Sequence, residues 1–120
     1  MEDKLRTMNT NSNKTYHLFF SNLSNPLRIE IVSALKKAEK GLSVGELASA
    51  LWVSQSKLSH ALAKLKKCNL VTSETRGKKR IYSLNRKTLV PILDLIDQHS
   101  HTYCNGNCMY CSRQEEKIGK

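Results

Sequence analysis

The stretch that decides the fold is Ser54-Gln55-Ser56-Lys57-Leu58-Ser59-His60-Ala61-Leu62-Ala63-Lys64-Leu65-Lys66-Lys67, which reads as one helix with two different faces. Ser54 suits the N-cap, because its hydroxyl can accept a hydrogen bond from the N–H groups of the first turn. One face is an apolar stripe at helical spacing, formed by Leu58, Ala61, Leu62 and Leu65. The other face has short hydrogen-bonding side chains first and cations later. This distribution is typical of a helix in the DNA major groove, although an ordinary solvated helix can also show it.

Length and charge limit the class of protein. A chain of 120 residues suits one domain with one modest hydrophobic core. Its 20 Lys and Arg residues against 10 acidic residues give a net charge of +10, which favours nucleic acid over an anionic membrane as the partner. No apolar run approaches the ~20 residues of a membrane span, and the N-terminus lacks a signal-peptide core. We therefore expect a cytoplasmic protein without a membrane partner, whose four cysteines are reduced thiols or metal ligands.

The N-terminal third of the chain predicts an arm and two helices. Residues 1–13 are polar without periodicity and predict a flexible N-terminal arm, whereas residues 14–23 are apolar enough for a short buried helix. The next helix is predicted over residues 26–40, with Asn25 as its cap and Gly41 as its stop.

A third helix leads into the Ser54 helix. Ser43-Val44-Gly45-Glu46 has the form of a capping box and predicts a helix that runs through Leu51. Trp52-Val53 then makes a short turn. Two short helices joined by such a turn are a helix-turn-helix, in which the second helix reads the DNA.

A hairpin follows. Residues 70–75 and 80–84 have the β-branched and aromatic content of two strands, with Arg76-Gly77-Lys78-Lys79-Arg80 at the turn. Cations at a hairpin tip repel one another unless a polyanion neutralises them, so we interpret the hairpin as a wing against DNA phosphates. The alternative is a solvated turn.

The last predicted helix spans residues 88–99, and its apolar side chains cover more of its circumference than one core face requires. A terminal helix that is apolar on two sides usually packs its second side against another subunit. A twofold dimer would place two reading helices about 34–36 Å apart on a palindromic operator. The alternative is a helix wholly covered by its own domain.

These motifs together resemble the ArsR/SmtB family of winged-helix transcriptional repressors. The family's opening motif resembles Leu23-Ser24-Asn25-Pro26-Leu27-Arg28, and its first motif helix resembles Leu42-Ser43-Val44-Gly45-Glu46-Leu47-Ala48. Its recognition helix resembles Val53-Ser54-Gln55-Ser56-Lys57-Leu58-Ser59-His60. The start, turn and end of its wing resemble Leu70-Val71, Arg76-Gly77 and Tyr82-Ser83-Leu84, respectively. The resemblance implies a homodimer built on the first and last helices, which represses transcription until an inducer, often a metal or metalloid ion, weakens DNA binding.

The inducer sites of that family are not reproduced. Its thiol site places cysteines where this sequence has Ser43 and Gly45, neither of which can ligate a soft metal. Its dimer-interface zinc site falls on four positions, of which only His99 is a metal ligand here. Those positions are Arg86, Thr88, His99 and Thr102.

Residues 100–120 form a cysteine-rich C-terminal tail with a C-x3-C-x2-C spacing. Cys104, Cys108 and Cys111 can supply three thiolates to one ion, and His101, or else His99, can complete a tetrahedral zinc site. Three thiolates alone suit a soft ion such as arsenite, cadmium, lead or copper(I), again one per subunit. Because thiolates also oxidise, the same cluster can serve as a redox switch.

Other interpretations of the cysteines stay open. The cluster would also suit a structural zinc staple in a constitutive DNA-binding protein, or an idle tail. Its spacing is shared with the iron–sulfur motif of radical S-adenosylmethionine enzymes, but only residues 112–120 follow it, too few for their barrel. An iron–sulfur sensor is therefore the remote alternative, and no enzyme activity is expected. Cys68 is expected to be inert and partly buried near the end of its helix.

The sequence as a whole predicts a mainly α-helical winged helix-turn-helix with about five helices and a small β-hairpin wing. The domain should span residues 14–99 and dimerise through its terminal helices. Its predicted function is sequence-specific repression at a palindromic operator in double-stranded DNA, tuned by a metal or metalloid ion or by thiol oxidation at the tail. The residues predicted to contact DNA are Ser54, Gln55, Ser56, Lys57, Ser59, His60, Lys64, Arg76, Lys78, Lys79 and Arg80.

Overall fold

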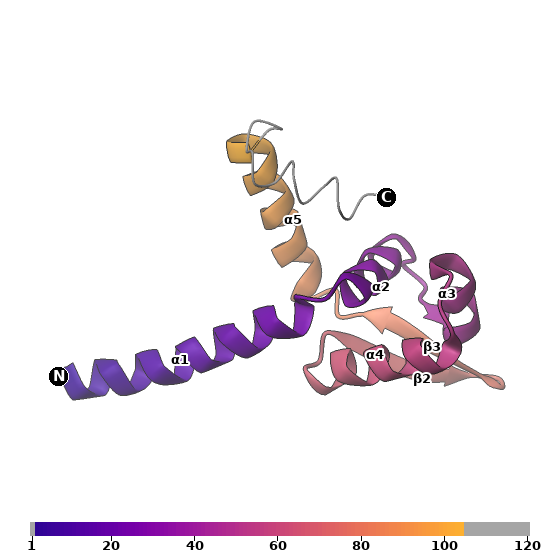
Figure 1. Ribbon diagram of the computed structural model, residues 1–120, viewed down its shortest axis with the longest axis horizontal. Coiled ribbons are helices and arrows are strands. Elements are labelled where there is room, and N and C mark those ends of the chain that lie inside the picture. The colour runs from indigo at the N-terminus through magenta and orange to yellow at the C-terminus, as the bar shows by residue number, and fades with distance from the viewer. Residues whose placement is uncertain (1, 105–120) are drawn as a thin grey trace.

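The computed structural model describes residues 2–104, with side chains from residue 12 onward. In chain order the elements are α1 (Glu2–Leu23), α2 (Pro26–Lys37), β1 (Leu42–Ser43), α3 (Val44–Leu51), α4 (Gln55–Lys67), β2 (Val71–Arg76), β3 (Lys79–Leu84), α5 (Leu89–His99) and the π-helix η1 (Ser100–Cys104). Figure 1 shows a body made of α2, α3, α4 and the sheet, from which α1 and α5 project in different directions. None of the helices within residues 2–104 is long and apolar enough to cross a membrane.

The core lies where α2, α3 and α4 pack on one another and on the sheet. The apolar stripe predicted on α4 faces this core, since Leu58, Leu62 and Leu65 are fully buried and Ala61 is nearly so. Burying one such leucine contributes about 1.5–3 kcal/mol, so the stripe fixes which face of α4 is left outward. Fully or nearly fully buried residues of other elements complete the core: Ile31, Val32, Leu35, Leu47, Val71 and Leu89.

The predicted helix starts are confirmed. Asn25, Ser43 and Ser54 each accept a first-turn backbone N–H with a side-chain oxygen, and Ser43 and Glu46 form the complete capping box. Asn69, just after α4, has a φ of 59°, in the left-handed region expected at a helix C-terminus. Each N-cap is worth about 1 kcal/mol and fixes where its helix begins.

The hairpin is confirmed and gains a third strand. β2 and β3 pair in antiparallel register from Val71 opposite Leu84 to Arg76 opposite Lys79. β1 pairs with the other edge of β3, which gives the order β1-β3-β2. The sequence analysis missed β1, because a strand of two residues cannot display an alternating pattern.

Gly41 has a different role from the one predicted. α2 ends at Lys37, not at residue 40, and Gly41 lies beyond that end with a φ of +86°. A Cβ at this position would lie 2.6 Å from Ser83 Oγ and 2.7 Å from the Tyr82 carbonyl oxygen. Glycine is therefore required for the close approach of this turn to β3, and not as the stop of α2.

The first helix differs most from its prediction. Instead of an irregular arm followed by a short buried helix, α1 is continuous from Glu2 to Leu23. No glycine or proline occurs before residue 26 to interrupt it. Leu23 is buried, whereas Tyr16, Leu18 and Phe20 are more than half exposed, because most of α1 projects away from the core (Figure 1).

The last helix has the predicted extent. Leu89 at its start is fully buried, but Leu95 and Ile96 are 64% and 49% exposed. The chain then continues into η1 and reaches Cys104. The prediction that α5 is apolar beyond the needs of its own core is therefore confirmed.

Candidate nucleic-acid interface

α4 presents an exposed polar face along its length. Each residue of α4 and its N-cap that was predicted to contact DNA is exposed. α4 contains no acidic residue, so nothing within the helix offsets the charge of its four lysines. A surface of one sign attracts a polyanion and raises its rate of association. The lysines are Lys57, Lys64, Lys66 and Lys67.

One of these lysines has a structural bond. Lys66 Nζ donates to Ser73 Oγ at 2.7 Å, which ties α4 to β2. Lys66 was not among the predicted DNA contacts. Lys57 and Lys64 make no side-chain hydrogen bond or ion pair within residues 12–104, and they line a groove of about 350 Å³ between α4 and the start of α2. The groove lining is Asn25, Leu27, Arg28, Ser56, Lys57, His60, Ala61 and Lys64.

Arg28 fixes the position of α2 against α1. Its Nη1 donates to Asn22 O at 2.8 Å and to Asn22 Oδ1 at 2.9 Å, so it satisfies a carbonyl at the end of α1. Asn22 Nδ2 in turn donates to the Lys64 carbonyl of α4 at 3.3 Å. The motif that opens α2 is therefore a three-way junction between α1, α2 and α4, and it holds α4 in place.

The wing carries three exposed cations at its turn and on β3. Gly77 and Lys78 form the turn, and Gly77 has a φ of +64°. Lys78, Lys79 and Arg80 are all exposed. These three side chains extend the positive surface of the protein from α4 to the hairpin.

Arg76 is engaged within the protein. Its guanidinium donates to Glu74 Oε1 through Nη2 at 2.6 Å and through Nε at 3.1 Å, and its Nη1 donates to the Lys40 carbonyl at 3.0 Å. The sequence predicts Arg76 as one of the wing cations that contact DNA. In the structure its guanidinium is instead paired with Glu74, two residues earlier on β2. Arg76 therefore braces the wing against the turn after α2.

A larger groove, of about 770 Å³, lies between α3 and β3. Glu46 lines it, and its carboxylate accepts from Ser43 N at 2.8 Å. The Ser43 backbone bond, followed by the Ser43 side chain and the charge of Lys79, holds the pKa of Glu46 below its ordinary value. The other lining residues are Ser43, Val44, Gly45, Ser49, Ala50, Lys79 and Arg80.

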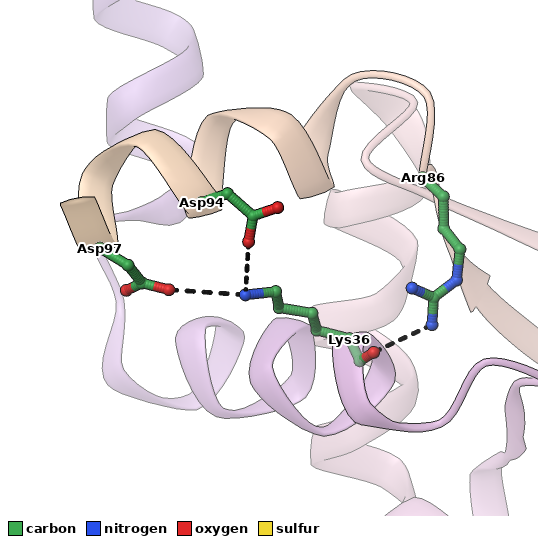
Figure 2. A network of polar contacts seen from close by, with 4 residues as sticks. All are labelled: Lys36, Arg86, Asp94 and Asp97. Carbon is green, nitrogen blue, oxygen red and sulfur yellow. Dashed lines mark hydrogen bonds and ion pairs between the residues drawn. The ribbon is translucent and has the colours of Figure 1, made fainter.

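α5 is joined to the body by a polar network that the sequence did not reveal (Figure 2). Lys36 Nζ lies 3.0 Å from Asp94 Oδ1 and 3.5 Å from Asp97 Oδ2. Arg86 Nη2 donates to the Leu35 and Lys36 carbonyls at 2.9 and 3.0 Å and so caps the end of α2. The hydrogen bond to Asp94 is the main reason that the pKa of Lys36 is raised. The network lies between α2 and the helix that leads to Cys104.

The structure places only part of the predicted metal cluster. Cys104 is half-buried at the end of η1, and His101 is exposed on the same segment. His99 packs against Tyr103, with ring centroids 5.1 Å apart. Cys108 and Cys111 lie outside the described residues. Within residues 2–104, no three His, Cys, Asp or Glu side chains come together as metal ligands.

Cys68 differs from its prediction, because its residue is exposed and not partly buried. It follows the last turn of α4, at the C-cap, where the backbone leaves the helix. The apolar stripe of α4 ends at Leu65, so the periodicity that buries the stripe does not extend to Cys68.

The positions of the family's known inducer sites do not form metal sites here. Ser43 Oγ accepts from the Glu46 N–H in the capping box, and Gly45 has no side chain. Arg86, at the first position of the interface site, is a cation already bonded to α2. The other three positions are Thr88, His99 and Thr102, of which only His99 is a metal ligand. One imidazole beside a guanidinium does not hold a divalent cation, so neither site fits a metal ion.

Known proteins share this sequence pattern and fold. Residues 25–73 match the family described as bacterial regulatory protein, arsR family. The chain is 34% identical over 103 residues to the transcriptional activator HlyU of Vibrio cholerae, which covers 86% of this chain and 90% of HlyU. It is 42% identical over 66 residues to the transcriptional repressor SmtB homolog of Synechocystis, over 55% of this chain and 48% of that protein. The crystal structure of NolR from Sinorhizobium fredii has a TM-score of 0.67 at 30% identity, over 80% of this chain and 91% of NolR.

The match to HlyU extends over most of both chains, and the structural match to NolR includes the winged helix-turn-helix described above. The predicted fold class is confirmed by these neighbours. The chain therefore belongs to the arsR family of bacterial transcriptional regulators, which bind DNA and are not enzymes.

Proposed function

We propose that this protein is a dimeric repressor that binds a palindromic operator and is released from it through the cysteines of its C-terminal tail. The observation that carries the proposal is the exposed, acid-free face of α4 beside a cationic wing. Ten of the eleven residues predicted from the sequence are assigned to operator binding, and the eleventh, Arg76, is assigned to bracing the wing. The ten are Ser54, Gln55, Ser56, Lys57, Ser59, His60, Lys64, Lys78, Lys79 and Arg80.

The two ends of α4 have different roles in this docking. Gln55, Ser56 and Ser59 lie in the first turns, where short hydrogen-bonding side chains can reach base edges in the major groove. Lys57 and Lys64 line the groove beside α2 and would neutralise phosphates of one strand. The wing would neutralise phosphates elsewhere along the duplex. Base contacts supply sequence preference in this arrangement, and phosphate contacts supply position and salt dependence.

The proposed dimer uses α1 and α5 from each of two copies. Both helices project from the body, and each leaves large apolar side chains exposed (Figure 1). A shallow groove of about 260 Å³ between them is lined almost wholly by apolar atoms from Phe20, Ile92, Leu95, Ile96 and His99. A contiguous apolar surface on terminal helices favours a second copy of the same chain as its occupant, since twofold homodimers are the commonest oligomers.

The effector step is assigned to the tail because η1 continues α5 directly to Cys104. Cys104, Cys108 and Cys111 supply thiolates, with His101 or His99 as a fourth ligand, for one zinc or softer ion per subunit. Binding there would cross-link the chain next to the interface helix and change the angle between the two copies of α4. Oxidation of the same thiols would act at the same place.

The test uses protein purified without oxygen, analysed for metal before and after loading with zinc, cadmium or arsenite. The Cys104→Ser/Cys108→Ser double variant is compared with Cys68→Ser, which removes the exposed cysteine at the C-cap of α4. We expect about one ion per subunit in the wild type and in Cys68→Ser, with none in the double variant. Loading, or mild oxidation, should release the wild type and Cys68→Ser from their operator but not the double variant.

Two results would contradict the effector step. Metal that binds the tail without changing operator affinity would identify a structural staple in a constitutive DNA-binding protein. A double variant released as readily as the wild type would place the sensor elsewhere. Iron with a visible absorption band would instead identify an iron–sulfur centre.

A further inference from the structure

Trp52 is held in an unusual backbone conformation. It is the C-cap of α3, with φ 59° and ψ 44°, in the left-handed helical region. This region is strained for a residue with a Cβ, whereas glycine enters it freely. The cap itself is a backbone feature, since the Trp52 N–H donates to the Ala48 carbonyl. Glycine or asparagine would supply the same cap with less strain.

The side chain of Trp52 is also almost fully exposed, at 92%. It is the only tryptophan of the chain. The hydrophobic core does not include it, and no aromatic ring within residues 12–104 stacks on it. A large apolar side chain in such a strained and solvated position adds little to the packing of residues 12–104. Its side chain is therefore not explained by the folding of the chain that surrounds it.

The position of Trp52 relates it to the duplex. It lies between α3 and α4, two residues before the Ser54 N-cap of the reading helix. In a docked helix-turn-helix, the first helix crosses the DNA backbone and the first turns of the second helix enter the major groove. The turn between them is consequently at the edge of the groove, where the sugar–phosphate backbone meets the bases.

We infer that Trp52 contacts operator DNA at the edge of the major groove, with its ring against sugar and base and its indole N–H available to a phosphate oxygen. This inference rests on the proposed function. Trp52 is a DNA contact that neither the charge pattern nor the polar face of α4 identifies. Because the indole is neutral, its contact adds affinity without releasing counterions.

The test uses a palindromic duplex selected from a random library by the wild-type protein, and a scrambled duplex of the same composition. Since Trp52 is the only tryptophan, its fluorescence reports this site alone. We expect the selected duplex to shift the emission of the wild type and to protect it from quenching by iodide. Trp52→Gly and Trp52→Asn both tolerate the left-handed conformation and should keep or raise the melting temperature.

Both variants should nonetheless bind the selected duplex about tenfold or more weakly, as a hot-spot tryptophan lost from each subunit would cause. The dependence of their affinity on salt should equal that of the wild type. Two results would overturn the role of Trp52, provided that the wild type prefers the selected duplex. One is unchanged affinity in both variants, and the other is iodide quenching of the wild type that DNA does not reduce. A wild type that does not distinguish the two duplexes would overturn the proposed function and this inference together.

Discussion

The Lys36 ammonium lies 3.0 Å from the Asp94 carboxylate, and this ion pair joins α2 to α5 (Figure 2). The same side chain reaches Asp97 one turn further along α5, at 3.5 Å. α2 also contacts α4, so α2 lies between α5 and α4 in the chain of contacts. In the proposed function, α5 is the interface helix and α4 the reading helix, and their shared contact with α2 would let both respond to one event at the tail.

Replacing Lys36 should loosen α5 while leaving the body intact. In Lys36→Met the carboxylates of α5 lose their cation, so amide hydrogen exchange in α5 should become faster while exchange in α4 stays unchanged. Lys37→Met, which removes a neighbouring exposed lysine that forms no ion pair within residues 12–104, is the control. Equal exchange rates in α5 of the two variants would show that the ion pair does not hold this helix.

The stability contributed by the ion pairs of Lys36 with Asp94 and Asp97 should depend on pH in a defined direction. Asp94 and then Asp97 raise the pKa of Lys36, so the protonated form is favoured in the folded protein. The contribution to stability is therefore fully present below the ordinary lysine pKa of 10.5 and is lost as pH rises through the folded-state value. The faster exchange of α5 amides expected in Lys36→Met should appear in the wild type only when the pH rises above the raised pKa of Lys36.

The cations of the wing should differ in their effect on DNA binding. Lys78→Ala removes an exposed cation and should weaken binding to every sequence, while the slope of log K against log salt falls by roughly 0.9 per lost phosphate contact. Arg76→Ala should change that slope less, because Arg76 bonds Glu74 and the Lys40 carbonyl. Binding measured across a salt series tests this, and equal slopes for both variants would contradict the assignment of Lys78 to a phosphate.

A charge placed on the proposed interface should separate the subunits. Leu95 is 64% exposed on α5 and lines the apolar groove beside α1. Leu95→Glu should give monomers in sedimentation experiments and should bind the operator at least about 100-fold more weakly, because one half-site alone is then held. Gln98→Glu, at an exposed polar position of the same helix, should remain dimeric. Monomeric wild-type protein that still binds the operator would contradict the proposed dimer.

Gly41 and Gly77 both have a positive φ, but their replacement by alanine should lower the free energy of unfolding by different amounts. Gly77→Ala meets nothing within 4 Å of its Cβ, so it should cost roughly 1 kcal/mol of unfolding free energy through its positive φ alone. Gly41→Ala adds the collision with Ser83 Oγ and the Tyr82 carbonyl and should cost about 3 kcal/mol or more. Urea unfolding measures both, and similar costs would show that the turn at Gly41 relaxes without loss.

Features with a local chemical cause were predictable from the sequence. Ser43 with Glu46, Ser54, and the stripe from Leu58 to Leu65 were correctly predicted because capping and helical burial depend on residues three or four positions apart. The wing was predictable because a glycine between two β-rich segments marks a turn. These local signals together establish the fold class.

Features that depend on distant partners were not predictable. The bonds of Arg86 to α2 and of Lys36 to α5 span 50 or more residues, and no spacing rule reports them. The exposure of α1 was not predicted for a related reason. Its apolar residues indicate burial, but they do not show whether the surface that buries them belongs to the same chain. Trp52 was read as part of a turn, since its conformation and exposure emerge only from the structure.

The central claim is that α4 reads the sequence of an operator. The most direct test compares the affinity of the wild type, at one fixed salt concentration, for the selected palindromic duplex and for its scrambled counterpart, alongside Gln55→Ala. We predict a preference of about 10³-fold or more in the wild type, reduced by about tenfold or more in Gln55→Ala. A ratio near one, with affinity that falls steeply as salt rises, would describe a protein that coats DNA and would contradict the account.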